Sequence, residues 1–278
     1  MVYRMVNILK KLPDALRAAA GLLTPDNCFV SAVIVAGGSG SRMGNMPRTK
    51  QLTEIGGIPV IVRTLLAFQS CTQVDEIIVA ARKDELSLYE DFKKKYGITK
   101  LVHAVAGGDT RRESVLNGIS VISGDSEYVA IHDGARCLIT PDMILSVLKK
   151  ACACGAAAAA ERMTDTVKRC DENGFITDTL DRADLWRAQT PQAFKTSLYL
   201  ASAYTAEAEG FEATDDCMLA EHLGFKVGLV DCGRENMKIT TREDLIIAKA
   251  ILDSRCIRET EKEIDGISGS GKRRKRGQ

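Results

Sequence analysis

Short runs rich in apolar residues alternate with longer amphipathic stretches along most of the chain. The runs have the length of buried strands and lie at residues 31–36, 75–81, 101–105, 128–131, 155–160 and 226–230. The stretches between them place apolar residues at helical spacing and predict helices at residues 59–69, 84–96, 141–151, 195–209 and 241–252. Strands that alternate with helices of about 10–15 residues predict a doubly wound α/β fold, in which helices cover both faces of a mostly parallel sheet.

The pattern changes between residues 162 and 192. Here Thr, Val, Phe and Ile alternate with polar residues on both sides of Asn173-Gly174, a dipeptide typical of the tight turn of a β-hairpin. The sequence therefore predicts an inserted hairpin arm at about residues 162–186. An arm inserted in a doubly wound domain needs a surface to cover it, and a twofold-related second copy is a common solution. This favours a homodimer.

The two ends of the chain have a different composition from the α/β part. Residues 1–27 mix apolar residues and cations at roughly helical spacing, interrupted by Pro13, and predict a helical extension. The last residues, GISGSGKRRKRGQ, combine Gly and Ser with basic side chains, so residues 259–278 are expected to form a disordered basic tail. The α/β domain is then assigned to residues 28–258.

Composition excludes several classes of function. The net charge is +1, which gives no electrostatic reason to expect nucleic acid or a membrane surface as a partner. No apolar run reaches the length of about 18 residues that a membrane-spanning helix needs. The nine cysteines include no C-x-x-C pair that would indicate zinc. Without a clear secretion signal, they are expected to be reduced thiols in a cytoplasmic protein.

A glycine-rich loop follows the first strand and carries the strongest chemical signal. It contains Gly37, Gly38 and Gly40, and the cations Arg42, Arg48 and Lys50 follow on the same segment. Glycines let backbone N–H groups approach and cradle phosphates, and the cations suit a polyphosphate that must lose charge in a transition state. The spacing fits neither a Walker loop nor the G-x-G-x-x-G dinucleotide fingerprint.

Two further strands end in clusters of the same kind. Residues 106–114 repeat the order of strand, glycines, polar cluster and helix, and residues 132–136 read His-Asp-Gly-Ala-Arg directly after a strand. Open α/β sheets bind their ligands at the carboxyl ends of the strands. The three segments are therefore expected to meet in one ligand site.

The motifs also occur in an order that is typical of one family. They read A-G-G-x-G-S-R-M-G, K-Q, G-G-D-x-R-x-x-S, H-D-x-A-R, D-T-V-K, L-W-x-x-Q-T-P-Q-x-F, T-D-D and N-x-K-I-T. Over about residues 31–254 the chain resembles the 2-C-methyl-D-erythritol 4-phosphate cytidylyltransferases of non-mevalonate isoprenoid biosynthesis. The resemblance implies a Rossmann-like fold and transfer of CMP from CTP to the erythritol phosphate, with release of pyrophosphate.

The resemblance also implies a role for individual residues. Those expected to stabilise the triphosphate are Arg42, Lys50 and Lys238, with Lys50 favoured over Arg48 because its neighbour relation to Gln51 is kept. Those expected to bind the nucleotide are Ala36, Gly37, Gly38, Gly40, Gly108, Asp109 and Ser114. Those expected to bind the polyol phosphate are Arg136 and, on an arm that reaches into the partner subunit, Thr166 and Arg182.

The implied cofactor is Mg²⁺ or another divalent cation, with Asp133 as the protein ligand. Mg²⁺ takes few carboxylates and is otherwise held by substrate phosphates and water, so one carboxylate at a strand end is sufficient. Asp215 and Asp216 could also form a pair of metal ligands, but Thr214-Asp215-Asp216 directly before a predicted helix is equally typical of an N-cap. They are left out of the metal site.

Four alternatives differ in what they require. Ribitol-5-phosphate cytidylyltransferase shares the motifs, and the long loop through residues 43–51 resembles that branch, whereas residues 165–192 resemble the erythritol branch. A nucleotide-sugar glycosyltransferase usually needs Asp-x-Asp at a strand end, and residues 132–135 offer one carboxylate. The glycine spacing disfavours a nucleotide-dependent oxidoreductase. A catalytically inactive binding protein would have no need for every cation of the set.

Overall fold

The computed structural model describes residues 28–38 and 49–272, with side chains up to residue 258. Its centre is a seven-stranded sheet in the order β11-β7-β10-β6-β1-β4-β5. The strands are β1 (Val30–Val35), β4 (Glu76–Ala81), β5 (Leu101–Ala106), β6 (Tyr128–Asp133), β7 (Ala156–Arg162), β10 (Trp186–Lys195) and β11 (Gly228–Asp231). All pairs are parallel except those that β10 makes with β6 and β7. The predicted doubly wound, mostly parallel α/β fold is confirmed.

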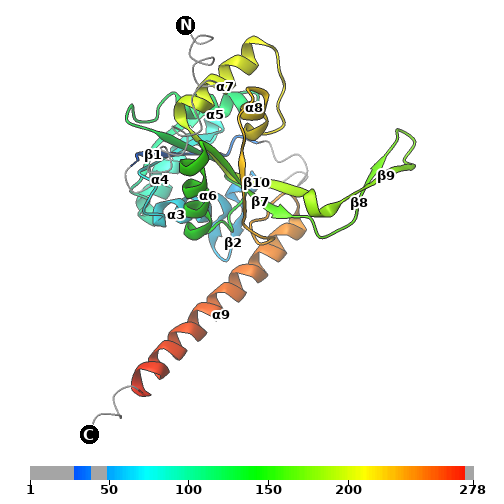
Figure 1. Cartoon of the computed structure of the whole chain (residues 1–278). Helices are drawn as coiled ribbons and strands as arrows, with labels where there is room; N and C mark the ends of the chain where they lie inside the picture. Colours follow the sequence, from blue (N-terminus) through cyan, green and yellow to red (C-terminus); the bar gives the residue numbers. More distant parts are fainter. Residues whose placement is uncertain (1–27, 39–48, 273–278) are drawn as a thin grey trace.

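Helices cover both faces of the sheet (Figure 1). One face packs α3 (Val60–Ser70), α4 (Leu86–Tyr96) and α6 (Pro141–Cys154) against the sheet. The other packs α5 (Arg111–Ile119), α7 (Thr196–Ala208) and α8 (Asp216–His222). Strand β1 is buried on both of these faces. Ala32 and Ile34 pack into the core on the side of α3, α4 and α6, whereas Val33 packs into the core on the side of α5, α7 and α8. A strand that is buried on both faces has a continuous run of apolar residues, and this run is the feature from which the strand was predicted.

Strand β10 was not predicted. The sequence predicts the hairpin arm to about residue 186 and a helix from residue 195, whereas residues 186–195 form a ten-residue strand between β6 and β7, antiparallel to both. The sequence pattern does not indicate this strand because it contains Pro191. Proline lacks an N–H group and is therefore rare in the interior of a central strand. The structure accommodates the proline in an irregularity, where the register against β7 shifts between Ala188 and Gln192.

The predicted hairpin is present as β8 (Val167–Cys170) and β9 (Ile176–Leu180), which pair antiparallel. Gly174 takes a φ of +84° in the connecting turn, a conformation that glycine adopts readily. The hairpin projects away from the sheet as an arm (Figure 1). Phe175 and Ile176 at its tip are 72% and 62% exposed.

The last helix is longer than predicted. Helix α9 spans Arg242–Lys272, so residues 259–272, expected to belong to a disordered tail, are helical. The prediction weighted the Gly and Ser residues near the end, whereas a long run of good helix formers precedes them. The helix begins as expected, since the backbone N–H of Thr241 donates to Asp244 Oδ2 over 2.8 Å. Residues 1–27 and 273–278 lie outside the described residues, so the helical extension remains a prediction.

Short elements complete the described chain. They are β2 (Glu54–Ile55), β3 (Ile58–Pro59) and the 3₁₀ helices η4 (Lys50–Leu52), η5 (Lys83–Glu85) and η6 (Arg182–Asp184). None of the helices in the described part of the chain is both long enough and apolar enough to cross a membrane.

Candidate active site

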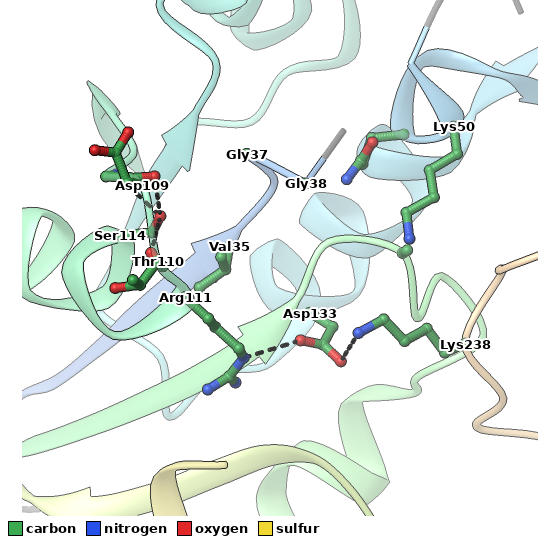
Figure 2. Close-up of a pocket in the computed structure, with 13 residues that line it drawn as sticks. Val35, Gly37, Gly38, Lys50, Asp109, Thr110, Arg111, Ser114, Asp133 and Lys238 are labelled. Atoms are coloured by element: carbon green, nitrogen blue, oxygen red, sulfur yellow. Dashed lines mark hydrogen bonds and ion pairs between the residues drawn. The ribbon is translucent and has the colours of Figure 1, made fainter. Parts of the chain in front are cut away.

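A pocket opens at the carboxyl ends of the parallel strands (Figure 2). Its lining comes from the segments after β1, β5 and β6, together with η4 and the loop before α9. The lining residues are Val35, Gly37, Gly38, Lys50, Gln51, Gly108, Asp109, Thr110, Arg111, Ser114, Asp133, Ala135 and Lys238. The structure therefore brings together the three predicted clusters, as expected for parallel strands whose ends share one edge of a sheet.

Asp133, the last residue of β6, is surrounded by cations. Its Oδ2 lies 2.9 Å from Nζ of Lys238 and 3.4 Å from Nε of Arg136, and its Oδ1 lies 3.6 Å from Nε of Arg111. Burial by itself raises the pKa of the Asp133 carboxyl. The attraction of the three cations outweighs burial and holds that pKa well below its usual range. Asp133 is thus ionised at neutral pH, and the group as a whole carries excess positive charge.

Two lysines from distant segments enter the pocket. Lys238 lies on the loop before α9, where the backbone N–H of Ile239 donates to the carbonyl of Ala135 over 2.8 Å. Lys50 is the first residue of η4 and extends into the pocket on the same side as Lys238, across from Ser114 and Arg111 (Figure 2). Gly40, Arg42 and Arg48 lie outside the described residues, so their expected roles remain predictions.

The first glycine loop leaves β1 through Ala36. Ala36 is fully buried, and its backbone N–H donates to the carbonyl of Ala80 over 2.7 Å, which extends the pairing of β1 with β4. Gly37 and Gly38 follow and line the pocket. The chain thus turns from the sheet into the pocket at the position that the sequence predicted.

A second glycine loop forms the wall between β5 and α5. The Ser114 hydroxyl accepts from the backbone N–H of Gly108 over 3.0 Å and donates to the carbonyl of Thr110. A Cβ on Gly108 would meet the Cβ of Glu113 at 2.3 Å, so the close approach of loop and helix requires glycine here. Ser114 and Gly108 thus shape the loop, and the exposed carboxylate of Asp109 lies beside it.

Arg111 is a site residue that the sequence reasoning did not assign, although it stands in the G-G-D-x-R-x-x-S motif. Its Nη1 lies 2.5 Å from Oδ2 of Asp216, so one guanidinium joins Asp216 of α8 to Asp133 of β6. Burial lowers the pKa of Arg111, but the two carboxylates raise it further than burial lowers it.

The N-cap interpretation of residues 214–216 is confirmed, because Asp215 accepts from the backbone N–H of Met218.

A neutral histidine lies behind Asp133. His132 is fully buried, and burial lowers its pKa to about 3. Its Nε2 lies 3.2 Å from the Arg136 carbonyl, which can only accept, so Nε2 carries the proton. Nδ1 then accepts from the Thr190 hydroxyl at 3.1 Å, while the same oxygen accepts from the backbone N–H of Asp133. The histidine thus fixes the strand end structurally.

Three predicted substrate residues lie outside this pocket's lining. Arg136 is close by, but its Nη1 donates to the Asn236 carbonyl over 2.9 Å. Thr166 and Arg182 are exposed at the base of the arm, where Arg182 donates to the carbonyl of Thr164. One chain therefore does not place the arm residues in its own pocket.

No group of three or more potential metal-ligating side chains occurs in the described residues. Asp133 is nevertheless suited to a hard divalent cation, because it is ionised and borders the pocket. Its Oδ1 makes the longest of the contacts with the cations, 3.6 Å from Nε of Arg111. One such oxygen fits a cation that is otherwise held by substrate phosphates.

A mostly parallel α/β sheet with two glycine loops and convergent cations at its carboxyl edge defines a nucleotidyltransferase. Residues 30–254 match the family model described as IspD, 2-C-methyl-D-erythritol 4-phosphate cytidylyltransferase, and the chain belongs to this family. It is 44% identical over 224 residues to an enzyme of that name from Caldanaerobacter subterraneus, covering 80% of this chain and 98% of the relative. An enzyme of the same name from Clostridium novyi is 41% identical, with 82% and 97% covered.

The fold is also similar to solved structures. The crystal structure of 4-diphosphocytidyl-2C-methyl-D-erythritol synthase from Anaerococcus prevotii has a TM-score of 0.72 and 34% identity, over 81% of this chain and 99% of that one. The 2-C-methyl-D-erythritol 4-phosphate cytidylyltransferase from Thermus thermophilus has a TM-score of 0.65 and 28% identity, over 80% and 98%. The predicted family and fold are confirmed.

Proposed function

We propose that this protein transfers CMP from CTP to 2-C-methyl-D-erythritol 4-phosphate, giving 4-diphosphocytidyl-2-C-methyl-D-erythritol and pyrophosphate. The observation that carries the proposal is the meeting of Lys50, Lys238 and Asp133 between two glycine loops. Relatives that bear this activity in their names match most of the chain. The reaction would belong to non-mevalonate isoprenoid biosynthesis.

The chemistry needs charge stabilisation more than proton transfer. An oxygen of the substrate phosphate attacks the α-phosphorus of CTP in line, and the bond to the bridging oxygen breaks as pyrophosphate leaves. Because the attacking phosphate is already ionised, no general base is required. Lys50, with Arg42 from the first glycine loop, holds the triphosphate. Lys238 adds a third cation near the α-phosphate, where it stabilises the charge that builds up in the transition state.

The nucleotide occupies the two glycine loops in this proposal. Gly37, Gly38 and Gly40 offer backbone groups to the triphosphate on one side, and Ala36 leads the chain from β1 into this loop. The loop containing Gly108 and Asp109, with Ser114 behind it, binds ribose and cytosine on the other. Backbone and carboxylate groups there can accept from the exocyclic amine of cytosine, which would distinguish it from uracil.

Asp133 is the residue that would hold Mg²⁺ or another divalent cation. When bound, such an ion neutralises phosphate charge and draws electron density from the leaving group. Within the chain, Asp133 also keeps Lys238, Arg111 and Arg136 oriented toward the pocket edge. The expected cytoplasmic location stays a prediction.

The test is pyrophosphate release from CTP and Mg²⁺, with methylerythritol phosphate and ribitol 5-phosphate supplied in parallel reactions. Release with the erythritol substrate alone supports the proposal. Release with ribitol 5-phosphate alone would refute the proposed substrate. The protein would then carry out the same chemistry on a different polyol phosphate. Release with neither would refute the activity, and UDP- and CDP-sugars would then be tested.

The arm supports a homodimer with shared sites. Its strands expose nearly every side chain, and an isolated two-stranded hairpin is marginally stable in water, so a partner surface is expected to cover it. In such a dimer Thr166 and Arg182 of one subunit complete the polyol-phosphate site of the other.

Mixing two inactive variants tests this arrangement. In a heterodimer of Lys238→Ala with Arg182→Ala, one of the two sites combines an intact pocket with an intact arm. Random re-association should restore about a quarter of wild-type turnover, since half of the dimers are mixed and each has one complete site. Mixtures that stay as inactive as the separate variants would refute the shared site.

A further inference from the structure

The loop that carries Lys238 is anchored on both sides of the lysine. On one side, buried Ile239 hydrogen bonds to the segment that follows β6, through the carbonyl of Ala135. On the other side lies Asn236, whose exposed fraction is 0%. A buried polar side chain in a half-buried loop requires hydrogen-bond partners, and those partners show which segments it holds together.

Asn236 is tied to the irregular part of β10. Its Nδ2 donates to Oε1 of Gln189 over 2.8 Å and to the carbonyl of Thr190 over 2.9 Å. Since the Thr190 carbonyl can only accept, the atom that faces it is the amide nitrogen. Gln189 in turn donates to the carbonyl of Gly233 over 3.0 Å. The side-chain amides of Gln189 and Asn236 therefore attach the segment from Gly233 to Asn236, which precedes Lys238, to β10 at both of its ends.

The same position of β10 holds Asp133. The Thr190 hydroxyl accepts from the backbone N–H of Asp133 over 3.0 Å, and Arg136 donates to the backbone carbonyl of Asn236. Asn236 thus connects the segment of Lys238 with both segments that surround Asp133. The other side-chain atom of the amide, Oδ1 of Asn236, has no hydrogen-bond partner among the described atoms.

We propose that Asn236 is a positioning residue for cytidylyl transfer, which holds Lys238 against Asp133 through the amide contacts with Gln189 and Thr190. The inference rests on the proposed function of Lys238. Lys238 has a flexible side chain that is 35% exposed, so the placement of its backbone decides where the ammonium group stands. A side chain that acts through Lys238 affects the transition state more than the binding of CTP, because the glycine loops bind the nucleotide elsewhere.

Kinetics of Asn236→Ala test the proposal. The variant should lower kcat roughly 10- to 100-fold, as expected when a reacting group is displaced by about 1 Å, with the KM for CTP within about threefold of wild type. The control is Ser31→Ala, which removes another buried hydrogen-bonding side chain at the opposite end of the sheet. It should lower the melting temperature and leave kcat unchanged.

Asn236→Asp adds a readout that a merely structural role would not move. A protonated carboxyl can donate to the Thr190 carbonyl in place of the amide, whereas an ionised one cannot. The charged groups around the position, Asp133, Arg136 and Lys238, are the same in both Asn236 variants. Because this position is fully buried, desolvation raises the pKa of a carboxyl there against the opposing effect of Arg136 and Lys238. The kcat of Asn236→Asp relative to Asn236→Ala should therefore be greatest at about pH 6 and fall toward about pH 9.

Several outcomes would overturn the inference. They are a kcat for Asn236→Ala within about threefold of Ser31→Ala, equal losses in kcat and in CTP binding, or a ratio of the two Asn236 variants that is independent of pH. A crystal structure of Asn236→Ala with Lys238 still bonded to Asp133 would also overturn it, whatever the activity. Full turnover of Lys238→Ala, by contrast, would refute the proposed function of Lys238 itself.

Discussion

Nζ of Lys238 lies 2.9 Å from Oδ2 of Asp133, although the two residues are far apart in the sequence. The pairing holds the ammonium group at the pocket edge before any substrate is present. Because Arg111 and Arg136 also face Asp133, the cations outnumber the carboxylate, and the site remains attractive to a triphosphate. Preorganised charge of this kind lowers a barrier without reorganisation during the reaction.

Removing either pocket lysine should abolish most of the turnover. We expect Lys50→Ala and Lys238→Ala each to lower kcat by about 10²- to 10³-fold, because each deletes a charge next to the reacting phosphates. The measurement is pyrophosphate release at saturating CTP. Lys249→Ala is the matched control, since that lysine is exposed on α9 and pairs with Asp253 away from the pocket. Near-normal turnover of Lys50→Ala, with an unchanged melting temperature, would contradict the assigned role.

An added methyl group on the second glycine loop should weaken nucleotide binding. In Gly108→Ala the new Cβ meets the Cβ of Glu113 at 2.3 Å, so the loop must move away from α5. We expect the KM for CTP to rise about tenfold or more, with a smaller change in kcat. Gly124→Ala is the control, because a Cβ there meets nothing within 4 Å. Equal kinetics for the two variants would show that the loop does not contact CTP.

The sequence predicted those parts of the site that depend on single strands. Asp133 and the two glycine loops follow apolar runs, and the carboxyl edge of a parallel sheet then brings them together. Arg111 could not be assigned in this way. Its partner Asp216 lies on a different helix, and no local pattern states which helix ends face each other.

The same limit applies to the sheet itself. The parallel pairs follow from the alternation of strands and helices, but β10 lies between β6 and β7, antiparallel to both, and contains a proline. Its place is determined by long-range packing against β6 and β7. The buried contacts of Gln189 and Asn236 depend on that placement, so the sequence could not predict them either.

Loss of Arg111 should destabilise the fold as well as the site. Arg111→Met leaves Asp216 buried without its cation, which should lower the free energy of unfolding by about 2–3 kcal/mol, discounted for the partial exposure of the arginine. The control Arg112→Met removes the hydrogen bond to the backbone carbonyl of Phe211, leaves both carboxylates their arginine and should cost less. Denaturant titration gives both values.

A double-mutant cycle separates this pairing from general damage. Arg111→Met with Asp216→Asn should recover part of the stability, because a neutral amide does not need the guanidinium. Burial already raises the pKa of Asp216, and removal of Arg111 raises it further. The deficit of the single variant should therefore shrink as the pH is lowered toward about 4. Additive effects of the two substitutions would show that the ion pair contributes nothing to stability.

The buried histidine should make the stability of the fold depend on pH. The pKa of His132 is about 3 in the folded protein and about 6.5 in the unfolded chain. Between these values the unfolded chain binds a proton that the native state does not, so stability falls as the pH falls. From pH 7 to pH 5 this one group should remove about 2 kcal/mol of unfolding free energy.

His132→Gln isolates that effect. The variant cannot bind the extra proton when it unfolds, so its loss of stability between pH 7 and pH 5 should be smaller than that of wild type by the same amount. Because the comparison uses the slope with pH, any constant cost of the substitution cancels. His103→Gln, at an exposed position of the edge strand β5, should keep the wild-type slope. If His132→Gln loses stability with pH as steeply as wild type, His132 is not held neutral in the folded protein.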